Sequence, residues 1–212
     1  MNIPEPSTLL TDYLLAAVNF AFALLIWRGI RTKPRTSAGL WSGAFLVTAL
    51  TALVGGTYHG FGPFLDTEKQ DFLWKVTVHL AGVLSLLMLS CSLMATVRGS
   101  LRRGLLLLAL LKFLAYSIWM LGHEDFRYVI YDYLPAMAGV LILHGYRAYK
   151  EKDKNAGWMV GGILVSFLAA FIQQSGLSMH KNFNHNDLYH VIQIGATYLL
   201  YRGARQLEDR KT

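Results

Sequence analysis

The sequence contains few charged residues and long stretches with none. Only 16% of its 212 residues are Asp, Glu, Lys or Arg, whereas 54% are hydrophobic. The hydrophobic residues occur in blocks close to the length needed to cross about 30 Å of hydrocarbon. This composition excludes an ordinary soluble domain and predicts an integral membrane protein.

The sequence also lacks a second cysteine. Cys91 is the only one, and it lies within an apolar segment, so the chain can form no intramolecular disulfide and no cysteine-rich zinc site. Any metal ion would have to be held by His, Asp, Glu or Asn. Residues 1–7 are not basic and no small-residue cleavage pattern follows the first apolar run, so we expect that run to remain as a transmembrane helix.

No long loop, internal repeat or low-complexity segment marks a second domain, so residues 1–212 are predicted to form a single domain. The formal net charge is +7, which in a soluble protein would favour nucleic-acid binding. Here the basic residues lie in short connections between apolar blocks instead of on one soluble face. We therefore interpret the positive charge as a signal of membrane topology. We expect lipid partners and no nucleic acid, and the oligomeric state stays open.

The apolar blocks are separated by charged or Gly/Pro-containing connections, and they predict an all-α bundle of seven transmembrane helices. The sequence places these helices at Leu9–Trp27, Ala38–Tyr58, Phe72–Val97, Leu105–Leu121, Tyr128–Tyr146, Gly157–Gln174 and Asp187–Tyr201.

Basic residues concentrate in every second connection and in the C-terminal tail, whereas acidic residues prevail in the others. The positive-inside rule then predicts that the N-terminus lies outside and the C-terminus lies in the cytoplasm. The sequence has no Asn-x-Ser/Thr glycosylation site and its loops are short, which favours a bacterial plasma membrane over a secretory-pathway membrane, the alternative.

Polar residues from three predicted helices gather at the outer end of the bundle. His59 closes the second segment, Asp71 opens the third and His190 lies in the first turns of the seventh. A catalytic zinc ion commonly takes three protein ligands and one water, so two histidines and one further donor would suffice. The third donor is either Asn186, which shares a helical face with His190, or His185, if the helix begins after it with Asn184 or Asn186 as its cap. Polar residues lying simply at headgroup level are the alternative.

This pattern resembles the superfamily of seven-span membrane hydrolases that contains the alkaline ceramidases and the adiponectin/progestin receptors. In that family a serine four residues before a histidine ends the second span, an aspartate begins the third, and His-x-x-x-His begins the seventh. The matching positions here hold Gly55, His59, Asp71, Asn186 and His190. The serine and the first histidine of the pair are therefore replaced.

The resemblance implies a zinc-dependent hydrolase that cleaves a lipid amide or ester from the outer-leaflet side. Zinc would be held by His59, His190 and either His185 or Asn186, and Asp71 would position the attacking water or carry its proton. Thr57 would supply the missing hydroxyl. The alternative is a non-catalytic seven-span protein that binds or senses a lipid or a metal; haem ligated by His79 or His59 is a weaker third reading.

Two charged residues within apolar segments predict an ion pair. Lys112 and Asp132 each lie more than one helical turn below the outer end of their segments, the fourth and the fifth. Unpaired charges at such depth are costly, so we expect these two to pair. His144 and His123 are interpreted as ordinary interfacial residues, and His79 as a hydrogen-bonded neighbour of the metal site.

Overall fold

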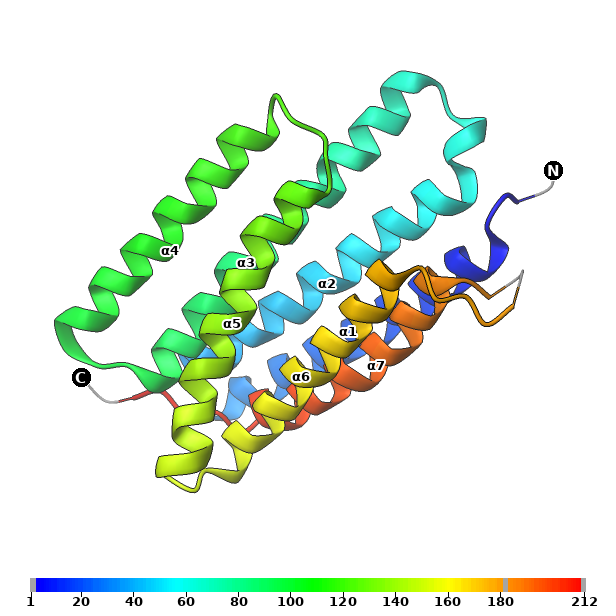
Figure 1. Ribbon diagram of the computed structural model, residues 1–212. Coiled ribbons are helices and arrows are strands. Elements are labelled where there is room, and N and C mark those ends of the chain that lie inside the picture. Colours follow the sequence, from blue (N-terminus) through cyan, green and yellow to red (C-terminus); the bar gives the residue numbers. More distant parts are fainter. Residues whose placement is uncertain (1–2, 181–182, 211–212) are drawn as a thin grey trace.

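The computed structural model describes residues 3–180 and 183–210, and this part of the chain is all-helical (Figure 1). No β-strand occurs among the described residues, where the only β-type pairing is an isolated bridge between His180 and Phe183. The prediction of seven helices is confirmed. They are α1 (Pro6–Thr32), α2 (Thr36–Phe61), α3 (Thr67–Thr96), α4 (Gly99–Met120), α5 (Arg127–Lys150), α6 (Lys154–Ser175) and α7 (His185–Ala204), with a short 3-10 helix, η1 (Gly62–Phe64), after α2.

Five of the seven helices, α1, α2, α3, α4 and α6, are long and apolar enough to cross a membrane. Helices α5 and α7 fall short of the same standard because each turns several polar side chains into the bundle. On α5 these are Asp132 and His144, and on α7 they are Asp187, His190 and Gln193. Length and composition thus support a membrane protein.

Six helices form a closed ring in the order α1, α2, α3, α5, α6, α7, because each packs against the next and α7 packs back against α1. Helix α4 lies outside this ring, against α3 and to a lesser extent α5 (Figure 1). The chain thus leaves the ring after α3 and returns to it with α5.

The hydrophobic core is continuous in only one half of the ring. Near the end that holds the C-terminus, one cluster joins all six ring helices. In the other half the buried apolar residues split into two clusters, one on α3, α4 and α5 and the other on α1 and α2 with Ile194 of α7 packed against it. Neither of these two clusters joins α5 to α6.

The C-terminal segment is fastened to the N-terminal end of α2. The carboxylate of Asp209 accepts hydrogen bonds from the backbone N–H groups of Thr36 and Ser37, each at 2.7 Å. Partial burial opposes ionisation of Asp209, but these hydrogen bonds outweigh it and hold its pKa below the usual range. Arg35 also donates to the carbonyl oxygens of Arg205 and Leu207.

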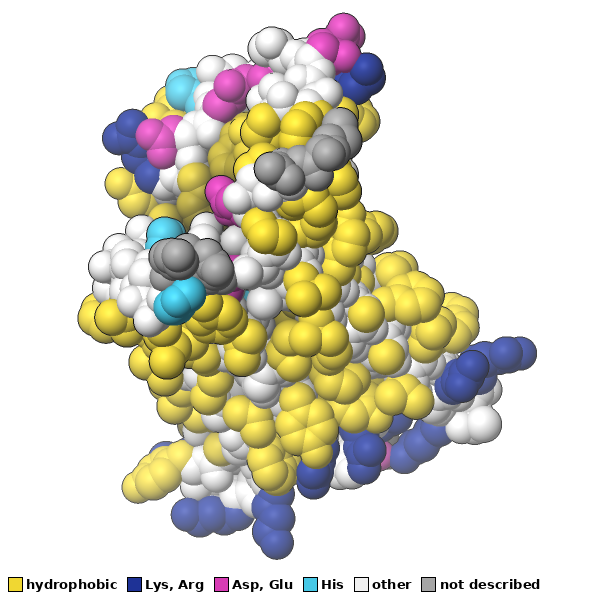
Figure 2. Space-filling view, turned by 90° about the vertical axis from the view of Figure 1, so that its right-hand side faces the viewer, with side chains coloured by type: hydrophobic (Ala, Val, Ile, Leu, Met, Phe, Trp, Pro, Cys, Tyr) yellow, Lys and Arg dark blue, Asp and Glu magenta, His cyan; other side chains and the backbone are white. Residues whose placement is uncertain are grey.

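The surface is divided by charge along the bundle. Figure 2 shows a broad hydrophobic band with most Lys and Arg side chains at the lower end, and with acidic and histidine side chains together with a few basic ones at the upper end. The large exposed hydrophobic residues are distributed over the outer faces of the helices, and Leu10, Phe20, Leu108, Ile142 and Phe171 are examples. Such a band is what a bilayer would cover.

The predicted ion pair is confirmed. Lys112 on α4 lies 2.5 Å from Asp132 on α5 and also donates to the hydroxyl of Ser85 on α3, at 2.9 Å. The interpretation of His144 was wrong: this side chain is fully buried and lies 3.2 Å from the hydroxyl of Ser92. Its place near the end of α5 suggested an interfacial residue, but the side chain faces Ser92 of α3 inside the bundle.

Candidate functional site

A cavity of about 310 Å³ lies inside the six-helix ring. Every ring helix contributes to its wall, and α4 contributes nothing to it. Along α2 the lining extends from Trp41 to His59, which corresponds to about 27 Å at 1.5 Å of rise per residue. The cavity is therefore elongated along the bundle axis.

One end of the cavity is apolar. Toward the basic end of the molecule, its wall is formed by Trp41 and Phe45 on α2, Met88 on α3, Met137 on α5 and Leu200 on α7. All five belong to the core cluster that joins the ring helices. This end is consequently closed and rigid.

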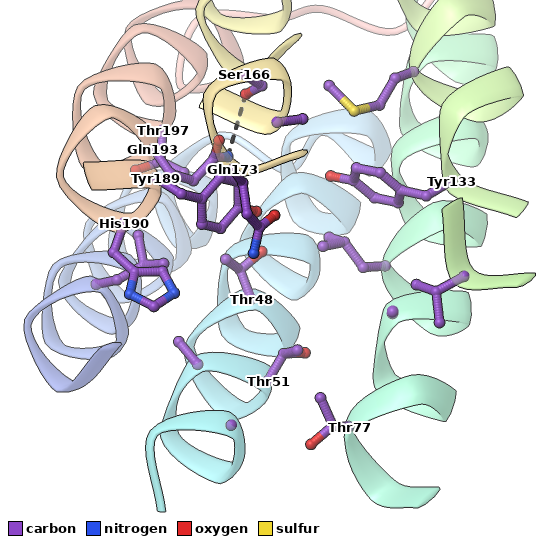
Figure 3. A pocket seen from close by; sticks show the side chains of 18 of the residues that line it. Thr48, Thr51, Thr77, Tyr133, Ser166, Gln173, Tyr189, His190, Gln193 and Thr197 are labelled. Carbon is purple, nitrogen blue, oxygen red and sulfur yellow. Dashed lines mark hydrogen bonds between the residues drawn. The ribbon is translucent and has the colours of Figure 1, made fainter. Parts of the chain in front are cut away.

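The remainder of the cavity carries hydroxyl, amide and imidazole groups from five helices, and Figure 3 shows most of them around one space. Two are joined to each other, because the side-chain amide of Gln193 donates to the hydroxyl of Ser166 at 3.2 Å. Such groups can orient a polar ligand through hydrogen bonds. The labelled polar residues are Thr48, Thr51, Thr77, Tyr133, Ser166, Gln173, Tyr189, His190, Gln193 and Thr197.

The most polar part of the wall is a pair formed by Asp12 on α1 and His190 on α7. Both side chains line the cavity and are only 4% and 6% exposed. Nε2 of His190 lies 3.1 Å from a carboxylate oxygen of Asp12, and Nδ1 lies 3.0 Å from the hydroxyl of Thr11. The imidazole is thus held at both nitrogens.

The hydrogen bonds around His190 assign one shared proton to this pair. Thr11 donates its hydroxyl proton to the carbonyl oxygen of Thr8, so its oxygen accepts the proton on Nδ1 of His190. Nε2 and the Asp12 carboxylate then need one proton between them, since a lone pair would otherwise face a carboxylate. Whichever of the two carries it, the pair has no net charge.

Further acidic and histidine side chains surround this pair. His59 lies 3.1 Å from the carboxylate of Glu5. Asp187 is fully buried; one of its oxygens accepts from the backbone N–H of Asn184 in the capping box that starts α7, and the other has no hydrogen-bond partner. Glu5 and Asp187 are near enough to repel the carboxylate of Asp12.

The structure brings two of the predicted site residues to the cavity. His59 and His190 line it, whereas Asp71, Thr57 and His185 do not. Asp71 is exposed on α3. Thr57 contacts the hydroxyl of Tyr13 at 3.0 Å and donates to a backbone carbonyl of its own helix. His185 is half-buried at the first position of α7, after Asn184 as cap.

The predicted zinc ligands do not converge on one point. In the described part of the chain, no group of three or more His, Cys, Asp or Glu side chains is arranged to hold a metal ion. Both ring nitrogens of His190 already have partners, and the side-chain oxygen of Asn186 accepts from Gln173 at 3.1 Å. The donors as they stand do not fit a zinc ion, so zinc stays a prediction.

Sequence reasoning missed Asp12, although the sequence contains a signal for it. An acidic residue within an apolar run is costly unless it has a partner or a task. Thr8, Thr11 and Asp12 also share one face at helical spacing, which marks a polar stripe on α1. Gln193 bridges α7 to Ser166 of α6 and also lines the cavity.

The exposed part of the cavity wall lies between α5 and α6. Among its lining residues, three have exposed side chains: Phe126 and Leu134 on the α5 side, and Gln174 on α6. The lining residues on α1, α2, α3 and α7 are buried or half-buried. This agrees with the two separate apolar clusters, which leave α5 and α6 without a shared core in this half.

The fold and the cavity together define an all-helical protein in which a ring of six helices encloses a binding-sized space. Over residues 7–209 the chain matches a family of unknown function, DUF6962, and it belongs to that family. No curated protein and no solved structure matches the chain.

Proposed function

We propose that this chain is a seven-span membrane protein that binds an amphipathic, lipid-like molecule in the cavity of its helix ring. The observation that carries the proposal is the cavity itself, which is apolar at one end and polar over the rest. Ligand sites are typically largely apolar clefts with a few placed polar groups, and their volumes begin at about 300 Å³. A ligand with one apolar chain and one polar group matches this wall.

The membrane placement is supported by the hydrophobic band and by the charge division along the bundle (Figure 2). Helices α5 and α7 complete the ring with α1, α2, α3 and α6, so they cross the same slab, with their polar groups turned inward. The N-terminus lies outside and the C-terminus in the cytoplasm, in the plasma membrane of a bacterium, as the charge pattern and short loops favour.

The apolar end of the cavity contains a fluorophore that reports on the ligand. Trp41 lies there, and the other tryptophans are Trp27, Trp74, Trp119 and Trp158. In a variant with these four changed to Phe, a lipid brominated at its chain end should quench Trp41 saturably at low mole fraction in nanodiscs. The same variant carrying Ala52→Phe, which narrows the cavity without adding a second tryptophan, is expected to show less quenching of Trp41. Absence of saturable quenching by any single-chain lipid would overturn the proposal.

The second candidate is the hydrolase that the sequence resemblance implies, acting on a lipid amide or ester. One observation favours it: the buried carboxylate of Asp12 lines the cavity with one oxygen held by His190, and its other oxygen can act as an oriented general base toward a water molecule when the shared proton is on His190. The Thr11 hydroxyl is not the nucleophile of this candidate, because Thr11 does not line the cavity and its proton is used by Thr8.

The two candidates differ in whether the protein hydrolyses the lipid that it binds. Purified protein in nanodiscs would be incubated with single-chain amides and esters, and the released acid would be measured. Hydrolysis by wild type, lost in Asp12→Asn while lipid binding persists, supports the enzyme. Asp71→Asn separates two forms of the hydrolase candidate. If the reaction takes place at Asp12 and His190 in the cavity, this variant retains hydrolytic activity. If the reaction uses the site residues of the resembled family, the variant loses hydrolytic activity. If no acid is released while lipid binding is intact, the protein binds the lipid without hydrolysing it.

A further inference from the structure

Neither Lys nor Arg occurs among the lining residues of the cavity, which are all described. The wall contains two histidines, and each already contacts a carboxylate, Glu5 for His59 and Asp12 for His190. Lys112, which lies within the helical part of the bundle, is outside the ring on α4 and is paired with Asp132. A ligand group with a negative charge would therefore find no counter-ion in the cavity.

The acidic residues near the cavity make a negative ligand still less favourable. The carboxylate of Asp12 is part of the wall, and those of Glu5 and Asp187 lie close to it. Asp187 is fully buried and one of its oxygens has no hydrogen-bond donor. Burying an anion without a cationic partner is costly, and placing it beside carboxylates adds repulsion.

The same carboxylates would attract a cationic ligand group, but Glu5 already contacts His59 and neither Glu5 nor Asp187 lines the cavity, so neither can pair with it directly. Asp12 is the only carboxylate of the wall, and its oxygen already contacts Nε2 of His190. Because these two residues share one proton, the pair is neutral as a unit and offers no net charge to an ammonium group. An ammonium group would have to displace His190, whose other nitrogen is fixed to Thr11.

We infer that the ligand is a single-chain lipid with an uncharged, hydrogen-bonding head group, such as an alcohol, an amide or an ester. This inference rests on the proposed lipid-binding function and adds the charge class of the ligand. The hydroxyl oxygens of Thr51 and Thr77, whose protons go to carbonyl oxygens of their own helices, supply uncharged acceptors. The side-chain amide of Gln173 supplies a carbonyl oxygen and its second N–H, because the first donates to Asn186 (Figure 3). A volume of about 310 Å³ stands at the low end of ligand sites, which favours one chain over two.

The test compares three lipids that share one chain. Oleyl alcohol, oleate and oleylamine would compete with the brominated probe for Trp41 at pH 7, in nanodiscs of zwitterionic lipid. We expect the alcohol to compete at a concentration at least tenfold lower than either charged lipid. Oleate or oleylamine competing as well as the alcohol would overturn the inference.

A charge added to the wall should reverse the preference between alcohol and acid. Thr51→Lys places an ammonium group on the cavity side of α2, and we expect it to improve competition by oleate at least tenfold relative to oleyl alcohol. Thr51→Met has a similar length without the charge and should keep the original preference. Thr77→Lys, with Thr77→Met, repeats the test from α3 in case the first variant fails to fold.

The outcomes separate the two proposals. Saturable quenching of Trp41 without a preference for the uncharged lipid refutes the charge class alone and leaves the binding site in place. An unchanged preference in both lysine variants, with folding intact, refutes it as well. Failure of every lipid to quench Trp41 refutes the proposed function itself.

Discussion

Lys112 and Asp132 show how charged residues stabilise one another between helices. Asp132 is almost fully buried and Lys112 about two-thirds buried, and the pair ties α4 to α5. Removing one partner leaves the other charge without compensation, which is more costly than removing both.

We expect Lys112→Met and Asp132→Leu each to lower the unfolding free energy, and the double variant to lose less than their sum. The coupling should be on the order of 0.5–3 kcal/mol, measured by chemical unfolding in detergent. Ser85→Ala removes only the secondary hydrogen bond to Lys112 and provides the control. Additive losses would mean that the charges do not interact.

The same pair shows what the sequence reveals about single residues. A Lys and an Asp at similar depth in apolar segments have few other partners, so their pairing was predictable. The Asp12–His190 contact was not, because it depends on α1 and α7 being neighbours, although they are the most distant helices along the chain. His59 and His190 were correctly placed near one end, but the sequence gives no direction for their side chains.

At the scale of one helix, Asp209 acts as a cap supplied from the far end of the chain. Its carboxylate accepts from the first N–H groups of α2, where no side chain of the preceding residues provides a cap. The pKa of Asp209 is lower in the folded state than its usual value of about 3.9. Its contribution to stability is therefore present above pH 4 and is lost as the pH falls through the folded-state pKa.

Asp209→Asn should lower the unfolding free energy by about 1 kcal/mol at pH 7, the usual contribution of a capping residue. The difference from wild type should shrink below pH 4, when the wild-type carboxylate is protonated. Thermal unfolding at pH 7 and pH 3.5 would measure this. Glu208→Gln changes an exposed neighbour that pairs with Lys33 and should have little effect at either pH. An equal difference at both pH values would contradict the charge-based contribution.

Helices α5 and α6 form the side from which a lipid would reach the cavity, if the proposed function holds. Leu134 on α5 lines the cavity and is 50% exposed, and Pro135 beside it prevents a regular backbone hydrogen bond at this point of the helix. An exposed lining residue must stand at the edge of an opening.

We expect Leu134→Tyr to slow probe binding several-fold, because the larger side chain narrows this opening without adding a second tryptophan to the assay. Leu168→Tyr is the matched control, since Leu168 lies on α6, is 52% exposed and does not line the cavity. Stopped-flow quenching of Trp41 by the brominated probe, in variants with the same Trp-to-Phe changes, gives the rates. Equal rates in the two variants would show that lipids take another path.

The helices themselves were more predictable than their arrangement. Apolar blocks gave all seven helices, with the ends shifted by a few residues: α3 begins at Thr67, five residues earlier than predicted, because Asp66 caps it. Helix α7 begins at His185 and not after it, with Asn184, one of the two expected residues, as its cap. Caps are local, so they can be inferred from sequence, whereas hydrophobicity alone places a helix end only where polarity rises.

At the scale of the molecule, the ring order could not be predicted. The displacement of α4 depends on how well its side chains fit α3 and α5 rather than on any pattern along the chain. One such fit is visible at Gly82 of α3, where the ring of Tyr116 packs so closely that a β-carbon would collide with it. The hydroxyl of Tyr116 donates to the carbonyl oxygen of Val78. This packing holds α4 outside the ring and leaves the interior free for the cavity.

The orientation of the whole molecule can be tested with single cysteines. Cys91 is buried and would first be changed to Ala. Because Lys and Arg gather at one end, we expect cysteines at Lys33 and Lys150 to be shielded from a membrane-impermeant thiol reagent in intact cells, and cysteines at Glu68 and Glu124 to react. Permeabilised cells, in which all four should react, provide the control. Reaction of Lys33 and Glu68 variants from the same side would contradict a membrane-spanning bundle, and the reverse pattern would place the N-terminus in the cytoplasm.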